Sequence, residues 1–214
     1  MHDAVTKLVS IQKEIQKKNH QIKIIAVSKT FPIEKIMPLI NFGHKDFGEN
    51  KVQEAAEKWT SIKQEFTDIK LHMIGKIQTN KVKHILPLFD YIHSLDNLKL
   101  AEKISNEQKK YEKIIKVFIQ VNIGNEPQKS GINPSDVKNF KDKCINELNL
   151  NVVGLMCLPP INKEVSSYFI EMNHLLKQTE LKELSMGMSH DYLDATEYNA
   201  SFVRIGSKIF GSRD

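Results

Sequence analysis

Short apolar segments alternate along this chain with longer segments whose apolar residues recur every three or four positions. The short segments are five to eight residues long and rich in apolar side chains, many of them β-branched, which is typical of buried strands. Eight of them occur, and they are the segments 24–28, 44–49, 71–75, 91–95, 116–123, 152–158, 184–188 and 202–206. The longer segments have the spacing of helices that bury one face. The pattern therefore predicts strands and helices in regular alternation.

Polar residues and prolines mark where the predicted helices begin. Asn and Asp side chains cap helix N-termini, and proline is tolerated in the first turn, as in the pair Asn133-Pro134. The residues expected at helix starts are Pro32, Asn50, Asp96, Asn133 and Asn162. A further amphipathic helix is predicted before the first strand, with an apolar stripe made of Val5, Leu8, Val9, Ile11 and Ile15.

Strands that alternate with helices pair in parallel and form an α/β fold. Eight of them favour a closed (β/α)8 barrel of the TIM type, preceded by one extra N-terminal helix. The last predicted strand ends close to the C-terminus, so we expect no helix after it and expect the N-terminal helix to take that place. A doubly wound open sheet is the alternative. We expect one domain spanning residues 1–214.

The composition is that of an ordinary globular protein with an excess of lysine. Of the 214 residues 40% are hydrophobic and 27% charged, and the net charge is +5. Lysines are spread along helical segments among acidic residues, so we interpret them as a solvated surface and expect no nucleic-acid binding. No apolar run could cross a membrane, and the N-terminus lacks the apolar core of a signal peptide. Cys144 and Cys157 are too few for a disulfide framework or a zinc cluster. We expect a cytoplasmic protein.

Arginine is rare in this chain. Of the 31 basic residues only Arg204 and Arg213 are arginine. A chain that uses lysine almost everywhere is expected to keep arginine where a planar, permanently charged group is needed.

Polar residues and glycines follow the predicted strands. In a barrel of this kind chemistry belongs at the C-terminal ends of the strands, although loops contain such residues in any case. Asn50 could be only a helix cap, and Ser94 only a turn residue. The strand ends carry Lys29, Glu49, Asn50, Gly75, Ser94, Asn122, Met156, Ser185 to Ser189, and Arg204 to Ser207.

The segments after the seventh and eighth predicted strands have the character of a phosphate site. The loops after these strands are the usual phosphate site of barrel enzymes, where small residues let backbone N–H groups approach the ligand. The residues that fit are Gly187, Ser189, Gly206 and Ser207, with Arg204 beside them.

Lys29 ends the first predicted strand, in the stretch IIAVSKT. An amine in a partly apolar cleft beside other positive charge has a lowered pKa and can attack a carbonyl carbon to form a Schiff base. A Schiff-base lysine facing a phosphate pocket fits two chemistries. One is a pyridoxal 5′-phosphate (PLP) site, and the other is an aldolase that acts on a sugar phosphate.

Eight ordered motifs resemble those of the PLP homeostasis proteins (the YggS/PROSC family), whose fold is like the N-terminal barrel of alanine racemase. The resemblance covers nearly the whole chain. Its motifs are AVSKT (26–30), FGENKVQE (47–54), HMIGKIQTNKVK (72–83), IHSLD (92–96), QVNIGNEPQKSG (120–131), GLMCLPP (154–160), LSMGMSHD (184–191) and VRIGSKIFGSR (203–213).

The resemblance implies a PLP-binding barrel of fold type III with PLP held as a Schiff base on Lys29. It implies that Arg204 faces the pyridine nitrogen, where a guanidinium should leave that nitrogen unprotonated. It places Ser189, Gly206 and Ser207 at the phosphate and Asn50 against the cofactor. Ser207 stands where the family usually has Thr. The family often has Gly-Ser-Thr where this chain has Ala200-Ser201-Phe202, so Phe202 either narrows the rim or packs under it. Glu126 and Lys129 lie in a family motif without an assigned role.

The function that the resemblance implies is storage, buffering or delivery of PLP, without strong catalysis and without a metal. PLP-dependent apoenzymes are candidate recipients, and we expect a monomer. The alternative is a small PLP-dependent amino-acid racemase, which would need a second acid/base such as a tyrosine. Tyr192 is the only tyrosine expected near the rim, and we interpret it as helix packing.

Overall fold

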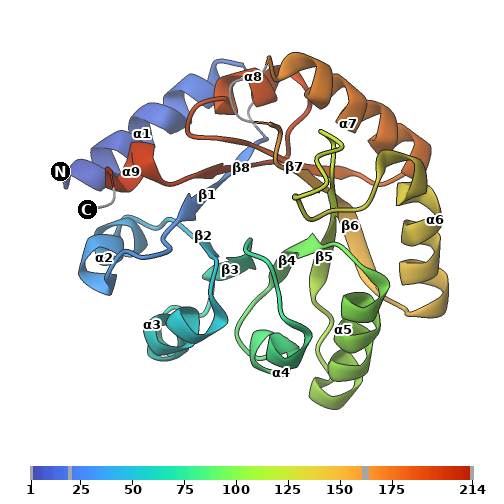
Figure 1. Cartoon of the computed structure of the whole chain (residues 1–214). Helices are drawn as coiled ribbons and strands as arrows, with labels where there is room; N and C mark the ends of the chain where they lie inside the picture. The colour runs from blue at the N-terminus through green and yellow to red at the C-terminus, as the bar shows by residue number, and fades with distance from the viewer. Residues whose placement is uncertain (1, 19–20, 161–163, 213–214) are drawn as a thin grey trace.

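The strands form a closed parallel barrel in which each strand pairs with its neighbours in sequence (Figure 1). This computed structural model describes residues 2–18, 21–160 and 164–212. The barrel closes where Ile25 lies opposite Arg204. The predicted TIM-type barrel is confirmed, and the open sheet is wrong. The strands are β1 (Lys23–Val27), β2 (Asp46–Glu49), β3 (Lys70–Met73), β4 (Tyr91–Leu95), β5 (Lys116–Val121), β6 (Asn151–Cys157), β7 (Glu183–Met188) and β8 (Phe202–Ile205).

Helices surround the barrel on its outside (Figure 1). They are α1 (Asp3–Gln16), α2 (Ile33–Asn41), α3 (Val52–Glu65), α4 (Val82–Ile85), α5 (Leu98–Tyr111), α6 (Val137–Asp142), α7 (Ser166–Thr179), α8 (Tyr192–Glu197) and α9 (Ser207–Phe210). Short 3-10 turns, Thr79–Lys81 and Pro134–Asp136, precede α4 and α6, and a π-helical turn, Lys143–Glu147, follows α6.

The helix starts correct the sequence predictions in two places. Asn97, rather than Asp96, caps α5, because its side chain accepts a hydrogen bond from Leu100 N at 2.9 Å. Asn50 is not the cap of α3, which begins after Lys51 without a side-chain cap. Asn50 is thereby available for another role. Asn162, expected at a helix start, lies outside the described residues.

The N-terminal helix covers the place where the barrel closes. It lies beside α2, α8 and α9, and Figure 1 shows α1 and α9 side by side. Its predicted stripe is buried, apart from a partly buried Val9. The expectation that no helix follows the last strand is wrong in detail, because the four-residue α9 follows β8. The larger helical cover at this position nevertheless comes from α1, as predicted.

Two apolar regions stabilise the barrel, one outside the strands and one inside. Side chains alternate between the two along each strand. Ile24 and Ala26 of β1 join the outer core under the helices, whereas Ile25 points into the barrel. The inner group consists of Ile25, Tyr91, Phe118, Met156 and Phe202. Phe202 therefore packs beneath the rim and does not narrow it. None of the helices in the described ranges has the length and apolar character needed to cross a bilayer.

Candidate functional site

A cavity of about 350 Å³ opens at the C-terminal ends of β1, β2, β7 and β8. Its walls come from segments far apart in sequence, which the closed barrel brings to one rim. The cavity is lined by every residue that the family resemblance places at the cofactor, namely Lys29, Asn50, Ser189, Arg204, Gly206 and Ser207. Sequence reasoning missed the other lining residues, which are Val27, Phe31, Ile74, Leu158, Met188, His190 and Gly211.

Lys29 lies in a tight turn directly after β1, and its side chain is half-buried. Ser28 before it still pairs with the sheet, since Ser28 N donates to Gly48 O at 3.0 Å. Thr30 after it has φ of 67°, a left-handed conformation that costs free energy for a β-branched residue. The chain thus turns sharply at Lys29, and contacts elsewhere must hold that turn.

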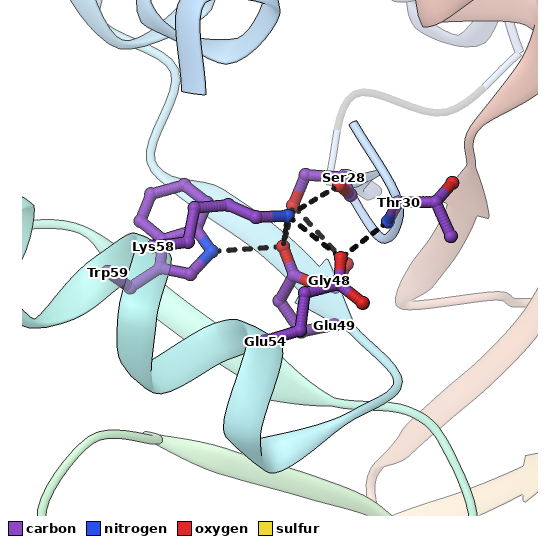
Figure 2. A network of polar contacts seen from close by, with 7 residues as sticks. All are labelled: Ser28, Thr30, Gly48, Glu49, Glu54, Lys58 and Trp59. Atoms are coloured by element: carbon purple, nitrogen blue, oxygen red, sulfur yellow. Dashed lines mark hydrogen bonds and ion pairs between the residues drawn. The ribbon is translucent and has the colours of Figure 1, made fainter. Parts of the chain in front are cut away.

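A buried polar network holds the residue before Lys29 (Figure 2). Lys58 of α3 donates from Nζ to Ser28 O at 3.0 Å and to Glu49 Oε1 at 3.0 Å. The same carboxylate oxygen accepts from Ser28 Oγ at 2.7 Å and from Trp59 Nε1 at 2.9 Å. Glu49 is completely buried and Lys58 is 9% exposed, so this is a desolvated ion pair. Removing one partner of such a pair typically costs about 3–5 kcal/mol.

The same network holds the residue after Lys29. Glu54 Oε1 accepts a hydrogen bond from Thr30 N at 2.6 Å and contacts Lys58 Nζ at 3.2 Å. Burial opposes ionisation of Glu54, but these hydrogen bonds outweigh it and lower the pKa of its carboxyl group. Sequence reasoning missed Lys58 and Glu54. Their spacing of four residues on a predicted helix was the available signal.

Arg204 lies on β8 with its guanidinium buried at the wall of the cavity. Nη1 donates to Ser185 Oγ at 2.6 Å, and Nη2 donates to the carbonyl oxygen of Cys157 at 2.8 Å. Burial lowers the pKa of Arg204, but an arginine remains protonated in proteins. Within the described ranges, no carboxylate forms an ion pair with Arg204. A buried cation without a carboxylate is a strong donor for an electron-rich ligand.

Small and hydroxyl-bearing residues form the side of the cavity after β7 and β8. Ser189 Oγ accepts a hydrogen bond from Gly206 N at 3.4 Å, which ties the two loops together. Ser207 follows as the first residue of α9. Gly187, which the sequence also suggested, is elsewhere: a Cβ there would lie 2.6 Å from Ala195 Cβ of α8. Gly187 therefore serves close packing of α8 and does not line the cavity.

The backbone of Asn50, which lines the cavity, packs closely against Gly75. A Cβ on Gly75 would lie 2.3 Å from the carbonyl oxygen of Asn50, so only glycine allows this approach. Ser94 Oγ donates to Gly75 O at 2.6 Å. Gly75 and Ser94, predicted at strand ends, thus lie beneath the site and support Asn50.

The remaining rim residues shape the neighbouring loop. Asn122 exchanges hydrogen bonds with the backbone of Glu126, at 2.9 Å and 3.2 Å. Glu126 in turn pairs with Lys129, whose Nζ contacts Pro159 O at 3.4 Å. This gives the motif residues Glu126 and Lys129 a structural role at the rim. Arg213, the second arginine, lies outside the described residues.

Comparisons with known proteins identify the family of this chain. The N-terminal domain of alanine racemase is the family model that matches, over residues 8–214. The pyridoxal phosphate homeostasis protein of Aquifex aeolicus (strain VF5) is 38% identical over 200 residues, covering 89% of this chain and 87% of that protein. PipY of Synechococcus elongatus PCC7942, solved with PLP bound, has a TM-score of 0.86 at 29% identity, covering 97% of this chain and 100% of that chain.

An alanine racemase of Clostridium difficile 630 shares the fold at lower similarity. It has a TM-score of 0.74 at 16% identity and covers 99% of this chain but only 57% of that protein. At this identity the likeness concerns the barrel alone. The family model and the curated relative together decide the assignment: the chain belongs to the alanine racemase N-terminal domain family and, within it, to the pyridoxal phosphate homeostasis proteins.

Proposed function

We propose that this chain binds PLP in the cavity at the ends of β1, β2, β7 and β8 and serves PLP homeostasis by storing, buffering or delivering the cofactor. The observation that carries this proposal is that one cavity contains Lys29, Arg204 and the hydroxyl-bearing loops after β7 and β8. An amine, a buried cation and a set of small polar residues match the aldehyde, the ring nitrogen and the phosphate of PLP. The names of the curated relative and of the PLP-bound PipY structure support the same ligand.

The roles follow from the position of each residue. Lys29 would hold PLP through a bond from Nζ to the aldehyde carbon, with loss of water. Arg204 would place its guanidinium near the ring nitrogen and disfavour protonation there, since two adjacent positive charges repel. Ser189, Gly206 and Ser207 would bind the phosphate through hydroxyl and backbone N–H donors. Asn50 would contact the ring from the side of β2. Bound PLP supplies an electrophilic carbon, and the lack of a carboxylate at its nitrogen makes it a weak electron sink.

A carrier fits these residues better than a racemase does. Tyr192, the tyrosine expected nearest the rim, is buried, and its hydroxyl donates to Glu14 of α1. In the part of the chain that the structure describes, no tyrosine lines the cavity. We propose further that residues 1–214 act as one domain, as a monomer, in the cytoplasm, and that PLP-dependent apoenzymes receive the cofactor.

Borohydride reduction followed by mass spectrometry tests the proposal. The protein is incubated with PLP, reduced, digested and searched for a pyridoxyl group, which we expect on Lys29. Lys29→Ala should abolish both the label and the absorption band of bound PLP. Lys99→Ala, which removes an exposed lysine of α5, should leave both unchanged. Failure of the native protein to bind PLP would overturn the proposal.

A second measurement separates carrier from racemase. The loaded protein is incubated in D₂O with each common amino acid, and exchange of the α-hydrogen is followed by NMR. We expect no exchange above the rate of free PLP. Rapid exchange with one amino acid would instead identify a racemase.

A further inference from the structure

A continuous chain of hydrogen bonds crosses the interior of the barrel from Arg204 to Asp46. Arg204 Nη1 lies 2.6 Å from Ser185 Oγ, and Ser185 Oγ lies 2.9 Å from His93 Nδ1. His93 Nε2 lies 2.9 Å from His72 Nδ1, and His72 Nε2 lies 3.0 Å from Asp46 Oδ1. Five strands each contribute one residue. The chain connects the wall of the PLP cavity with a carboxylate at the start of β2.

The carboxylate at the end of this chain fixes the direction of every bond once both imidazoles are neutral. A carboxylate only accepts, so His72 donates to Asp46 from Nε2. A neutral His72 then has a bare Nδ1, which accepts from His93 Nε2. A neutral His93 in turn accepts at Nδ1 from the Ser185 hydroxyl, whose oxygen accepts from the Arg204 guanidinium. All four bonds therefore run in one direction, from the cation to the carboxylate.

Aromatic packing holds both imidazoles in the orientation that this order requires. The His93 ring stacks on Phe118, with centroids 4.4 Å apart and planes 13° apart. The His72 ring stacks on Tyr91 at the same centroid distance, with planes 8° apart. Phe202 contacts both imidazoles from the side. Neither ring can turn away without disturbing the inner core.

The surroundings favour neutral imidazoles and a charged carboxylate. Burial lowers the pKa of His72 and of His93, and the latter also lies near Arg204. Burial opposes ionisation of Asp46, but the hydrogen bond from His72 outweighs this and lowers the pKa of Asp46. Lys23, His44 and Asp90 are the other titratable groups whose charge acts on this end of the chain.

Polar side chains in the middle of a barrel need an explanation, because apolar residues would fill this space without a desolvation cost. We propose that His93 and His72 are positioning residues for Arg204. Their hydrogen bonds orient the Ser185 hydroxyl so that its oxygen accepts from the Arg204 guanidinium, and they connect that guanidinium with the carboxylate of Asp46. This proposal rests on the proposed function in one respect, namely that Arg204 contacts PLP. The histidines touch no ligand and act through Arg204.

The first test needs no cofactor. Nitrogen-15 NMR of the histidine side chains in the full chain without PLP reports which ring nitrogen carries the hydrogen. We expect His72 and His93 to be neutral near pH 7, each with the hydrogen on Nε2. A hydrogen on Nδ1 of either residue, or a charged imidazole, would overturn the proposed chain.

The second test asks whether the chain matters for PLP. His93→Phe and His72→Phe keep an aromatic ring in the stack but remove the hydrogen bonds. Each should release PLP about three- to tenfold faster than the native protein, a change of the size of one hydrogen bond, because Ser185 then holds Arg204 without support from the histidines. Each should also shift the pH dependence of the absorption band of bound PLP, while borohydride still links PLP to Lys29.

The matched control is His44→Phe. His44 is also packed against an aromatic ring, Phe47, and its Nε2 contacts the backbone oxygen of Asp46 at 2.9 Å, but it lies outside the chain. It should retain PLP like the native protein. Native-like PLP release in both His93→Phe and His72→Phe would overturn the positioning role. If one variant does not fold, the other and the NMR result still decide. A native protein with the expected tautomers that fails to bind PLP would overturn the proposed function alone.

Discussion

The Nζ atom of Lys58 lies 3.0 Å from the carbonyl oxygen of Ser28, the residue immediately before Lys29. The proposed PLP lysine is thus held in place by a second lysine on the helix after β2. Lys58 also neutralises the completely buried carboxylate of Glu49, while Glu54 binds Thr30 on the other side of Lys29 (Figure 2). The turn that presents Lys29 is fixed from outside the barrel, which leaves the inner side of the turn to the cavity.

Lys58→Met should destabilise the protein and weaken PLP binding. The substitution leaves Glu49 buried without its cation, which typically costs about 3–5 kcal/mol of the free energy of unfolding. It also releases Ser28, so Lys29 should react more slowly with PLP. Urea unfolding and the rate at which the absorption band appears measure the two effects.

Lys63→Met is the matched control on the same helix. Lys63 pairs with Asp90 at 2.7 Å, but the two side chains are 18% and 21% exposed. Water can solvate Asp90 once Lys63 is gone, so the loss of stability should be smaller and PLP binding unchanged. Equal effects of the two substitutions would contradict the role given to Lys58.

Gly206→Ala should leave the fold intact but weaken PLP binding. A Cβ at Gly206 would lie 3.4 Å from Val27, an ordinary contact, and its φ of −115° suits any residue. The methyl group would stand at the proposed phosphate site, so we expect about three- to tenfold weaker PLP binding, comparable with the loss of one hydrogen bond. Titration with PLP and urea unfolding check the two parts.

Gly154→Ala should have the opposite effect to Gly206→Ala and lower the stability of the fold. Its Cβ would lie 2.0 Å from the carbonyl oxygen of Glu183 on the neighbouring strand, far from the cavity. It should lower the stability by about 1–3 kcal/mol or more. If Gly206→Ala binds PLP as tightly as the native protein, Gly206 is not at the phosphate.

The sequence was informative wherever a feature depends on local pattern. Strand β4 has the predicted bounds, and Lys29 and Arg204 line one cavity because parallel strands bring their C-terminal ends to one rim. Contacts between distant segments were not predictable in this way. Lys58 has the appearance of a surface lysine on an amphipathic helix, and only the packing of α3 against β1 and β2 buries its charge. His72 and His93 lie in strand segments, and their connection to Arg204 depends on the register of five strands.

Cys144 and Cys157 should be unreactive in the folded protein. Both are free thiols buried in the core, and burial raises the pKa of each to about 12. The thiolate is the reactive form, so almost none is present near pH 8. Mass spectrometry after iodoacetamide treatment should show no alkylation in buffer and two alkylated cysteines in urea. Labelling of Cys157 in buffer would indicate that the wall beside Arg204 opens.

The stability of the protein should fall as the pH decreases below the ordinary histidine pKa of 6.5. Burial lowers the pKa of His72 and His93 in the folded protein, so they stay neutral where the unfolded chain binds protons. The unfolded state then binds more protons, and each histidine removes at most about 2 kcal/mol from the free energy of unfolding between pH 6.5 and pH 5. His44, whose pKa burial also lowers, adds to the same trend, and Asp46 contributes only at lower pH, since its pKa is lowered. Urea unfolding at several pH values measures the slope, which should be shallower in His93→Phe than in the native protein. An identical slope in the two proteins would mean that His93 is protonated in the folded state, contrary to the hydrogen-bond order derived for the barrel interior.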